Sequence, residues 1–333
     1  MGDSLLDRAG LAQAVSILKA AKRVLICTHA RPDGDALGSE LALGRLLAGQ
    51  GKDVDLVVEA GAPADLTFLP GSARIGGTAA AVRPPYDWMV VVDAAGIERI
   101  EGMQKAIPPG QRILNIDHHA SNTRFGHQNW VEPESASVGE MIYVLAREAG
   151  WPIDRDAAVC LYVAVITDTG RFAFSSTRPS THLMAAELLK LGVQPGEINR
   201  QIWGSKSLGE LKLHGETIRS IRTAEKGRIA WAALTQEMFD ASGVVPLESQ
   251  DYVTLVKSVK GVEVAILLRP LSDREIKISL RTESSADASA ICALFGGGGH
   301  KRAAGATLRM SMDDAVKAVV AAAAEELKKG KVS

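Results

Sequence analysis

Residues 23–35 read RVLICTHARPDGD, an apolar run that stops at a cluster of histidine and acidic side chains. The apolar part predicts a β-strand at residues 23–28. A helical pattern resumes shortly after the acidic cluster. His29, Asp33 and Asp35 are therefore expected between the end of a strand and the beginning of a helix.

Strand and helix patterns alternate over the first 200 residues. The predicted helices cover about residues 4–21, 37–49, 137–148 and 155–167, with more between 179 and 220, and further strands cover residues 53–58, 88–92 and 112–116. The last two strands are continuous apolar runs, which is typical of strands buried on both faces. Interleaved strands and helices predict an α/β fold with a doubly wound, mostly parallel sheet.

The pattern changes from about Gly227 onwards. Three strands lie close together in the sequence and are followed by a helix, a glycine run and a final Ala-rich helix; they cover residues 228–234, 262–268 and 275–280. We interpret this part as a second, smaller α/β domain. The expected division is a metal-binding catalytic domain at 1–206, a linker helix at 207–222 and a substrate-binding domain at 223–333, with a cleft between the two domains.

Further acidic and histidine side chains follow other apolar runs. The strand at 88–92 ends in Asp93, and the strand at 112–116 ends in Asp117-His118-His119. The run at 163–167 ends in Asp168. Ligands of open parallel sheets bind at the carboxyl ends of the strands. We therefore expect these side chains to meet those of residues 29–35 at one edge of the sheet.

Four clustered carboxylates would repel one another strongly. Two carboxylates ~4 Å apart repel by about 4 kcal/mol at an effective dielectric constant near 20. Two divalent cations would neutralise the four charges of Asp33, Asp35, Asp93 and Asp168. The imidazoles of His29 and His118 beside hard carboxylates favour manganese, with iron, cobalt or zinc able to substitute. The pattern predicts a two-metal site for in-line displacement at phosphorus.

Each feature has a simpler interpretation when it is taken alone. Pro-Asp-Gly-Asp is typical of a solvent-exposed turn, and an Asp that closes a strand is often a turn residue or a helix cap. His118-His119 could be a chance pair. All these features fall at the ends of predicted elements in a chain with only 7 His, which favours the metal site.

Composition excludes several other classes of protein. The chain has 333 residues, and 38 Lys and Arg against 39 Asp and Glu give a net charge of −1, which argues against binding of long duplex DNA through bulk charge. Three separated cysteines form no CxxC pair, so neither a disulfide framework nor a thiolate zinc site is expected. The acidic N-terminal residues do not resemble a signal peptide, and no apolar run approaches a membrane span. We expect a cytoplasmic protein without a membrane partner.

The pattern as a whole resembles the DHH phosphoesterase superfamily. The resemblance rests on His29-x-x-x-Asp33-x-Asp35, Asp93, the triplet at 117–119 and Asp168, and on GGGGHKRAAG at 296–305, which is similar to the signature of the associated DHHA1 domain. It extends over about residues 15–315. The two-domain layout resembles the bacterial branch of nanoRNases and pAp phosphatases. Pyrophosphatases of the superfamily lack the GGGGH pattern, and RecJ-type exonucleases are generally longer.

The resemblance implies roles for the residues of the first domain. The implied ligands are His29 and Asp33 for one ion, Asp35 and His118 for the other, and Asp93 and Asp168 for both. Asp117 would orient an imidazole, and His119 would face the scissile phosphate as a hydrogen-bond donor. Two divalent ions, Mn²⁺ above all, are the implied cofactors, and no covalent intermediate is expected.

The resemblance also implies a substrate-binding set in the second domain. A glycine run lets backbone N–H groups approach an anion closely. The implied set is Arg281, Gly297, Gly298, Gly299, His300 and Arg302, with Lys301 as an alternative to Arg302. Thr282 stands where relatives often carry Ser, which retains the hydroxyl. Asn122 and Arg124 are further candidates for phosphate contacts.

The implied activity is hydrolysis of very short RNA and of adenosine 3′,5′-bisphosphate (pAp), by an oligoribonuclease of the nanoRNase type. A cyclic di-AMP or pApA phosphodiesterase keeps the same chemistry, whereas a non-catalytic nucleotide sensor or an adaptor protein would not. The expected partner is short RNA or a small nucleotide. The resemblance allows a homodimer, although no apolar stripe in the sequence demands one.

Overall fold

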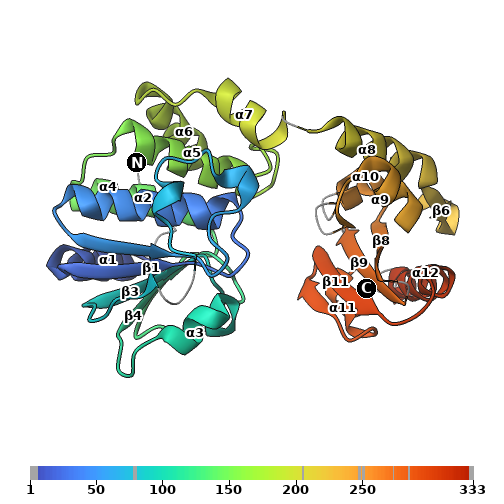
Figure 1. Ribbon diagram of the computed structural model, residues 1–333, viewed down its shortest axis with the longest axis horizontal. Coiled ribbons are helices and arrows are strands. Elements are labelled where there is room, and N and C mark those ends of the chain that lie inside the picture. Colours follow the sequence, from blue (N-terminus) through green and yellow to red (C-terminus); the bar gives the residue numbers. More distant parts are fainter. Residues whose placement is uncertain are drawn as a thin grey trace. The chain divides into compact units, whose positions relative to one another are not determined.

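Parallel strand pairing organises the first of the two units into which the chain divides, Met1–Ser205 and Lys206–Ser333 (Figure 1). The computed structural model describes residues 7–77, 81–204, 206–246, 249, 252–272, 274–283 and 286–329, and at His300 the main chain alone. No helix in these ranges is both long and apolar enough to cross a membrane.

The first unit alternates strands with helices, as predicted. In chain order its elements are α1 (Arg8–Ala20), β1 (Arg23–Cys27), α2 (Gly34–Gly49), β2 (Asp53–Val57), β3 (Trp88–Val92), α3 (Gly102–Ala106), β4 (Ile113–Asp117), β5 (Gln128–Val131), α4 (Val138–Ala149), α5 (Arg155–Asp168), α6 (Pro179–Lys190) and α7 (Pro195–Trp203). The strands form a 5-stranded sheet in the order β2-β1-β3-β4-β5. All of its pairings are parallel, which confirms the predicted sheet.

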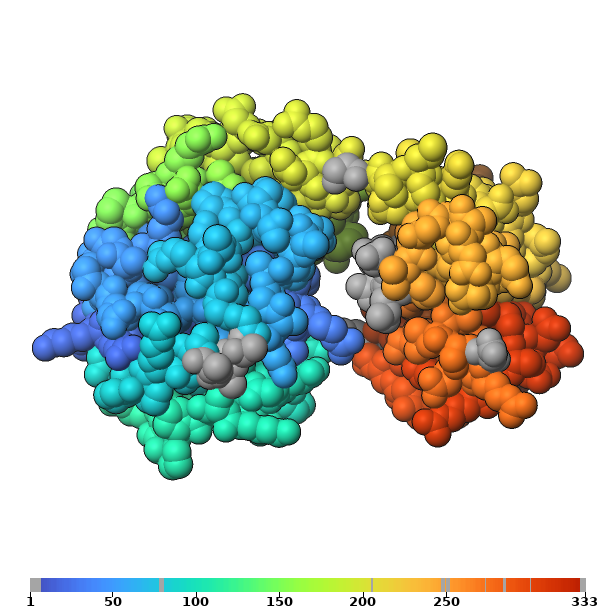
Figure 2. Space-filling view, in the orientation of Figure 1, coloured from blue at the N-terminus to red at the C-terminus, as the bar shows by residue number. Residues whose placement is uncertain are grey.

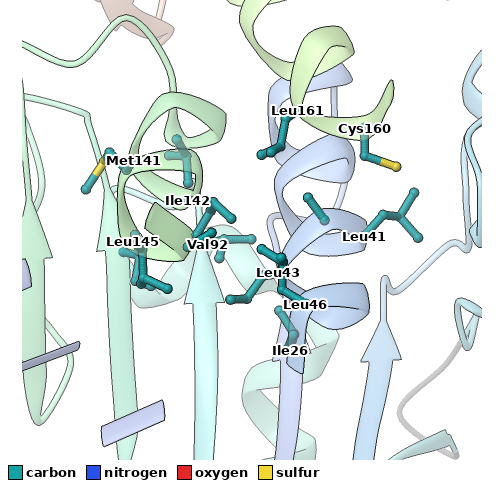
Figure 3. Packing of buried hydrophobic residues seen from close by; sticks show 14 of the residues in the cluster. Ile26, Leu41, Leu43, Leu46, Val92, Met141, Ile142, Leu145, Cys160 and Leu161 are labelled. Carbon is teal, nitrogen blue, oxygen red and sulfur yellow. The ribbon is translucent and has the colours of Figure 1, made fainter. Parts of the chain in front are cut away.

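Alternate residues of the central strands enter two separate cores. Ile26, Val92 and their neighbours on one sheet face pack under α2, α4 and α5. Figure 3 shows this packing, with side chains of the three helices meeting above β1 and β3. On the other face, Cys27 and Val91 belong to a second cluster, which includes Met103 of α3. Both faces of the sheet are thus covered, which explains the continuous apolar runs.

Helix α2 begins at Gly34, three residues before the predicted beginning at Leu37. The reason is the side chain of Asp33, which accepts hydrogen bonds from the backbone N–H groups of Asp35 and Ala36 and caps the helix. The acidic cluster is therefore the first turn of a helix, not a separate loop.

The irregular segment after β2 packs against the helices of the main core. Its Leu66 and Leu69 are buried in the main core. In Figure 2 the segment, in light blue to cyan, forms a large part of the visible face of the first unit.

The second unit has a mixed sheet. Its elements are α8 (Leu208–Ser220), β6 (Arg222–Ala224), β7 (Ile229–Ala233), α9 (Gln236–Ser242), α10 (Val253–Lys257), β8 (Val264–Ser272), β9 (Glu275–Thr282), α11 (Ala288–Ala293), β10 (Gly298–His300), β11 (Ala303–Leu308) and α12 (Met312–Lys329). The 6-stranded sheet has the order β10-β11-β9-β8-β7-β6, in which β7 and β8 are parallel and the other pairs antiparallel. One face packs against α11 and α12, and the other against α8, α9 and α10 over β7 and β8.

Candidate metal centre and substrate-binding face

The order of the strands places the site. The chain leaves the adjacent strands β1 and β3 in opposite directions, because β2 lies beyond β1 and β4 lies beyond β3. Such a reversal opens a crevice at the carboxyl ends of the two strands, where α/β proteins bind their ligands. His29 follows the end of β1, and Asp93 directly follows β3.

Asp35 is held between the first turns of two helices. It lies in the first turn of α2, and its carboxylate accepts hydrogen bonds from the N–H groups of Val138 (2.7 Å) and Gly139 (2.9 Å) at the beginning of α4. The hydroxyl of Ser39 donates a third hydrogen bond at 3.1 Å. Helix N-termini favour negative charge, so these contacts orient an ionised carboxylate.

The predicted ligands converge. Three groups each offer nitrogen or oxygen atoms that all lie within 4.8 Å of one another: His29, Asp33 and Asp93; Asp35, His118 and Asp168; and Asp93, His118 and His119. Nε2 of His118 lies 3.4 Å from Asp168 Oδ2, 3.7 Å from Asp93 Oδ1 and 3.8 Å from Asp35 Oδ2. Nε2 of His29 lies 3.7 Å from Asp93 Oδ2. Seven side chains from four chain segments thus lie close together.

Asp93 belongs to two of these three groups, as does His118. It adopts a left-handed backbone conformation (φ 55°), which is uncommon outside glycine. Its Oδ1 atom is buried and has no hydrogen-bond partner. A buried carboxylate oxygen without a donor is costly unless a cation binds it. This orphaned oxygen, together with the Asp and His donor set around it, fits a divalent metal ion.

The carboxylates destabilise one another in the absence of a cation. Burial raises the pKa of Asp35 well above its usual range, and the charges of Asp93 and Asp168 raise it further. Burial also raises the pKa of Asp93 well above its usual range, with Asp33 as the largest contributing charge. The pKa of Asp168 is raised mainly by burial. A divalent cation would offset this repulsion and favour the ionised carboxylates.

The two histidines respond oppositely to the same surroundings. Burial lowers the pKa of His118, but the carboxylates of Asp35, Asp168 and Asp93 outweigh burial and raise this pKa to about 9. Burial lowers the pKa of His29 to about 4, since Asp33 only partly opposes it. His29 is therefore a neutral ligand at any physiological pH, whereas His118 must release a proton before its Nε2 atom can bind a metal.

Asp117 orients His119. Its Oδ1 atom lies 2.7 Å from Nδ1 of His119, and its Oδ2 atom accepts a hydrogen bond from the Asn122 amide at 2.6 Å. The same amide also donates to Asn115 Oδ1 at 2.8 Å. Asn122, a candidate phosphate contact from the sequence, instead uses its amide N–H groups to fix Asp117.

In the second unit, Arg281, one of the predicted substrate-binding residues, lies on strand β9. The side chains of Ile276, Ile278 and Leu280 enter the core, so Arg281 lies on the opposite face with Lys277 and Ser279. Arg281 pairs with Ala303 of β11. The hydroxyl of Thr282 donates to the Lys301 carbonyl at 2.7 Å and fixes the turn that carries exposed Arg302. The role of the His300 imidazole lies outside the described part of the chain.

The second half of the glycine run, Gly298 and Gly299, belongs to strand β10. A Cβ atom on Gly299 (φ 144°) would lie 2.6 Å from the Ala303 oxygen, and one on Gly297 would lie 2.3 Å from the Gly305 oxygen. Close packing of β10 on β11 therefore explains these two glycines. A Cβ on Gly298 would meet nothing within 4 Å. Neither packing nor a positive φ accounts for Gly298, so close approach of a ligand to its backbone is the interpretation that remains.

Comparison with known proteins gives the lineage of the chain. The model of the DHH family, N-terminal domain, matches residues 23–165, and that of the DHHA1 domain matches residues 232–329. The bifunctional oligoribonuclease and PAP phosphatase NrnA of Thermus thermophilus is 33% identical over 313 residues, which are 93% of this chain and 92% of that protein. The chain belongs to the DHH family.

Other relatives agree over the full length. The DHH-family protein of the same name from Bacillus subtilis is 27% identical over 88% of this chain and 91% of its own length. The crystal structure of an exopolyphosphatase-related protein from Bacteroides fragilis has a TM-score of 0.92 at 27% identity, covering 99% of this chain and 100% of that chain. The resemblance to the DHH superfamily and its DHHA1 domain is thereby confirmed.

Sequence reasoning missed the residues that support the DHH-family ligands. The carbonyl of Ser135 lies 3.1 Å from Nδ1 of His118. Ser39 and the α4 N-terminus hold Asp35, and Asn122 holds Asp117. Of these contacts, only the Ser137 cap of α4 has a sequence signal, since Ser followed three residues later by Glu is a helix-start pattern.

Proposed function

We propose that this chain is a metal-dependent phosphoesterase that hydrolyses very short RNA and removes the 3′ phosphate of pAp. The observation that carries the proposal is the convergence of Asp93 with His29 and Asp33 in one group and with His118 in another, together with a third group in which His118 meets Asp35 and Asp168. Curated relatives that match this chain over most of their length are named as bifunctional oligoribonucleases and PAP phosphatases. The site and the lineage point to the same chemistry.

The ligand sets would be His29 and Asp33 for one divalent cation, and Asp35, His118 and Asp168 for a second, with Asp93 between them. The mixture of imidazole and carboxylate donors favours Mn²⁺. Such cations, when bound, lower the pKa of a water molecule and stabilise the negative charge that develops on a phosphoryl group.

The chain itself would position the phosphate and supply a donor. Asp117 engages Nδ1 of His119, and the doubly protonated imidazole could then donate its Nε2 proton to a phosphate oxygen. Asn122 keeps the Asp117 carboxylate in place for this task. No nucleophilic side chain takes part in this mechanism: the described cysteines are buried, and burial raises the pKa of Cys27 well above its usual range.

The second unit would bind the anionic part of the substrate. Arg281 and Lys277 share one face of β9, and Gly298 exposes its backbone on the neighbouring hairpin. Cationic side chains beside an accessible backbone N–H suit a phosphate group. His300 and Arg302 are proposed as further phosphate contacts.

Chelator-stripped protein should be inactive and should hydrolyse a labelled diribonucleotide and pAp after Mn²⁺ is added. A parallel panel of pAp, diribonucleotide, pApA and cyclic di-AMP distinguishes the substrates. Preference for the last two would replace the proposed substrate and keep the chemistry. Tight nucleotide binding without turnover on any substrate would indicate a sensor and refute the proposal.

A further inference from the structure

Glu140 contacts residues that hold the proposed metal ligands, and the proposed mechanism gives it no role. It stands in the first turn of α4 and is 5% exposed. Its Oε2 atom accepts hydrogen bonds from the Ala136 N–H (2.8 Å) and the Ser135 hydroxyl (3.4 Å). Its Oε1 atom accepts one from the Thr181 hydroxyl of α6 (3.2 Å). This buried carboxylate therefore joins the loop before α4 to a helix further along the chain.

The loop that Glu140 holds supports two of the proposed ligands. The Ser135 carbonyl lies 3.1 Å from His118 Nδ1, so that Nδ1 donates a proton and Nε2 is left to face the carboxylates. Three residues later, the N–H groups of Val138 and Gly139 bind the Asp35 carboxylate. A shift of this short segment would therefore displace His118 and Asp35 together.

The chain contains an internal reference for this glutamate. Ser137-Val138-Gly139-Glu140 begins α4, and Ser207-Leu208-Gly209-Glu210 begins α8 with the same spacing. At α8, Glu210 forms an ordinary capping box, because its Oε2 atom accepts from the Ser207 N–H at 2.7 Å. At α4, the Ser137 hydroxyl still accepts a hydrogen bond from the Glu140 N–H at 3.0 Å. The Glu140 carboxylate, however, accepts hydrogen bonds from the Ala136 N–H and the Thr181 hydroxyl. Helix capping alone does not explain this arrangement.

We infer that Glu140 is a positioning residue of the metal centre, which fixes the 135–139 segment so that the Ser135 carbonyl sets the His118 ring and the start of α4 sets Asp35. The inference rests on the proposed metal-dependent function and adds a residue that touches neither substrate nor ion. Thr181 connects the beginning of α6 to Glu140. Its hydroxyl accepts a hydrogen bond from the Arg178 N–H at 3.2 Å and donates one to the Glu140 carboxylate. The nearest cationic atom, Nη2 of Arg178, lies 4.0 Å from Glu140 Oε2.

The test measures metal binding apart from turnover. Mn²⁺ is titrated calorimetrically into chelator-stripped wild type, Glu140→Ala, Glu140→Gln and the matched control Glu210→Ala. Loss of an outer partner of a metal ligand typically lowers metal affinity about 10- to 100-fold. We expect a loss of this size for Glu140→Ala, a smaller loss for Glu140→Gln because its amide oxygen can still accept from Ala136, and none for Glu210→Ala.

Kinetics add a readout that a general structural defect would not produce. The Mn²⁺ concentration for half-maximal rate should rise for Glu140→Ala by the same 10- to 100-fold, with KM for pAp unchanged at saturating Mn²⁺. Equal losses in Glu140→Gln and Glu140→Ala would show that charge, not position, is what matters, and would overturn the inference.

Outcomes for the inference and for the proposed function can be told apart. Wild type that binds no Mn²⁺ refutes the proposed function. Wild type that binds Mn²⁺, together with a folded Glu140→Ala of equal affinity, refutes only the role of Glu140. Should Glu140→Ala fail to fold, Glu140→Gln decides, because it keeps the size of the side chain and weakens the contacts to Ala136 and Ser135 by removing the charge. Unchanged Mn²⁺ affinity in that folded variant overturns the inference.

Discussion

Asp93 combines an unfavourable backbone conformation with an unfavourable charge. Its φ of 55° is rare for a residue with a Cβ, and its buried Oδ1 atom lacks a donor. Both features cost stability in the folded protein without a ligand. Both costs would be offset if Asp93 binds divalent cations, as proposed for it.

Replacement of this carboxylate should separate stability from function. Because burial and Asp33 raise the pKa of Asp93, its ionisation opposes folding at neutral pH. Asp93→Asn removes that charge, so the metal-free variant should melt at the same temperature as wild type or higher. Turnover with Mn²⁺ should fall by at least ~100-fold, since a shared ligand is lost. Thermal melts with and without Mn²⁺ check this, and a variant that keeps wild-type turnover would exclude Asp93 as a ligand.

Glu40 is a second buried carboxyl, and neither of its oxygens has a hydrogen-bond partner among the described residues. Burial raises its pKa from 4.5 to about 8, although the backbone of Val57 opposes this. The folded protein then holds a proton that the unfolded chain releases. Stability should therefore fall as pH rises from about 4.5 to about 8, by at most roughly 4–5 kcal/mol, and level off above that range.

Glu40→Gln should weaken this dependence of stability on pH, to which the raised pKa values of Asp35, Asp93 and Asp168 contribute in the same direction. Urea unfolding of the first unit at pH values of about 5 and 8 gives the comparison. We expect the variant to gain stability over wild type at the higher pH, and the partly exposed control Glu216→Gln to behave as wild type. A Glu40→Gln variant with the same dependence on pH as wild type would show that Glu40 is ionised when folded.

At the scale of elements, the β10–β11 hairpin distinguishes two uses of glycine. Gly299→Ala places a Cβ 2.6 Å from the Ala303 oxygen at a positive φ, so it should destabilise the second unit by about 1–3 kcal/mol. Gly298→Ala meets no atom within 4 Å and should leave the melting temperature unchanged, while raising KM for pAp if a phosphate approaches this backbone. Melting curves and steady-state kinetics of both variants test the distinction. An unchanged KM in Gly298→Ala would remove Gly298 from the substrate-binding set.

The elements that the sequence predicts well are those whose side chains are uniformly buried. β1 and β3 have continuous apolar runs because buried clusters cover both faces of their sheet. β5 was missed, since Gln128 and Asn129 are only partly buried at the sheet edge. β10 and β11 were missed because glycine and alanine give no strand signal. Their pairing depends on close backbone approach, which no single-residue preference encodes.

The candidate site also contains residues that the sequence predicts and residues that it does not. Its proposed ligands were predictable because Asp and His stand directly after apolar runs, and the sheet then brings them together. Ser135 contributes a backbone carbonyl, which any residue type could provide, and Glu140 carries an ordinary helix-start signal. Only the three-dimensional contacts identify such supporting residues.

At the scale of the whole molecule, the cores and the candidate metal groups are unevenly distributed. Each unit has its own buried clusters, two in the first and two in the second. All candidate metal groups found among the described residues lie in the first unit. Ligand binding stabilises only the cooperative unit that contains the site. The two units should therefore respond differently to metal.

Calorimetric unfolding of the chelator-stripped chain should show this difference directly. Mn²⁺ at about 100 times its dissociation constant adds about 2.7 kcal/mol to the stability of the unit that binds it, which corresponds to about 5–10 °C for a unit of this size. We expect that shift in one transition and little change in the other. Asp93→Asn is the control, because it leaves both cores intact and should abolish the shift. Equal shifts of both transitions would mean that metal also stabilises the second unit, through a ligand of its own or by coupling the two units into one cooperative structure.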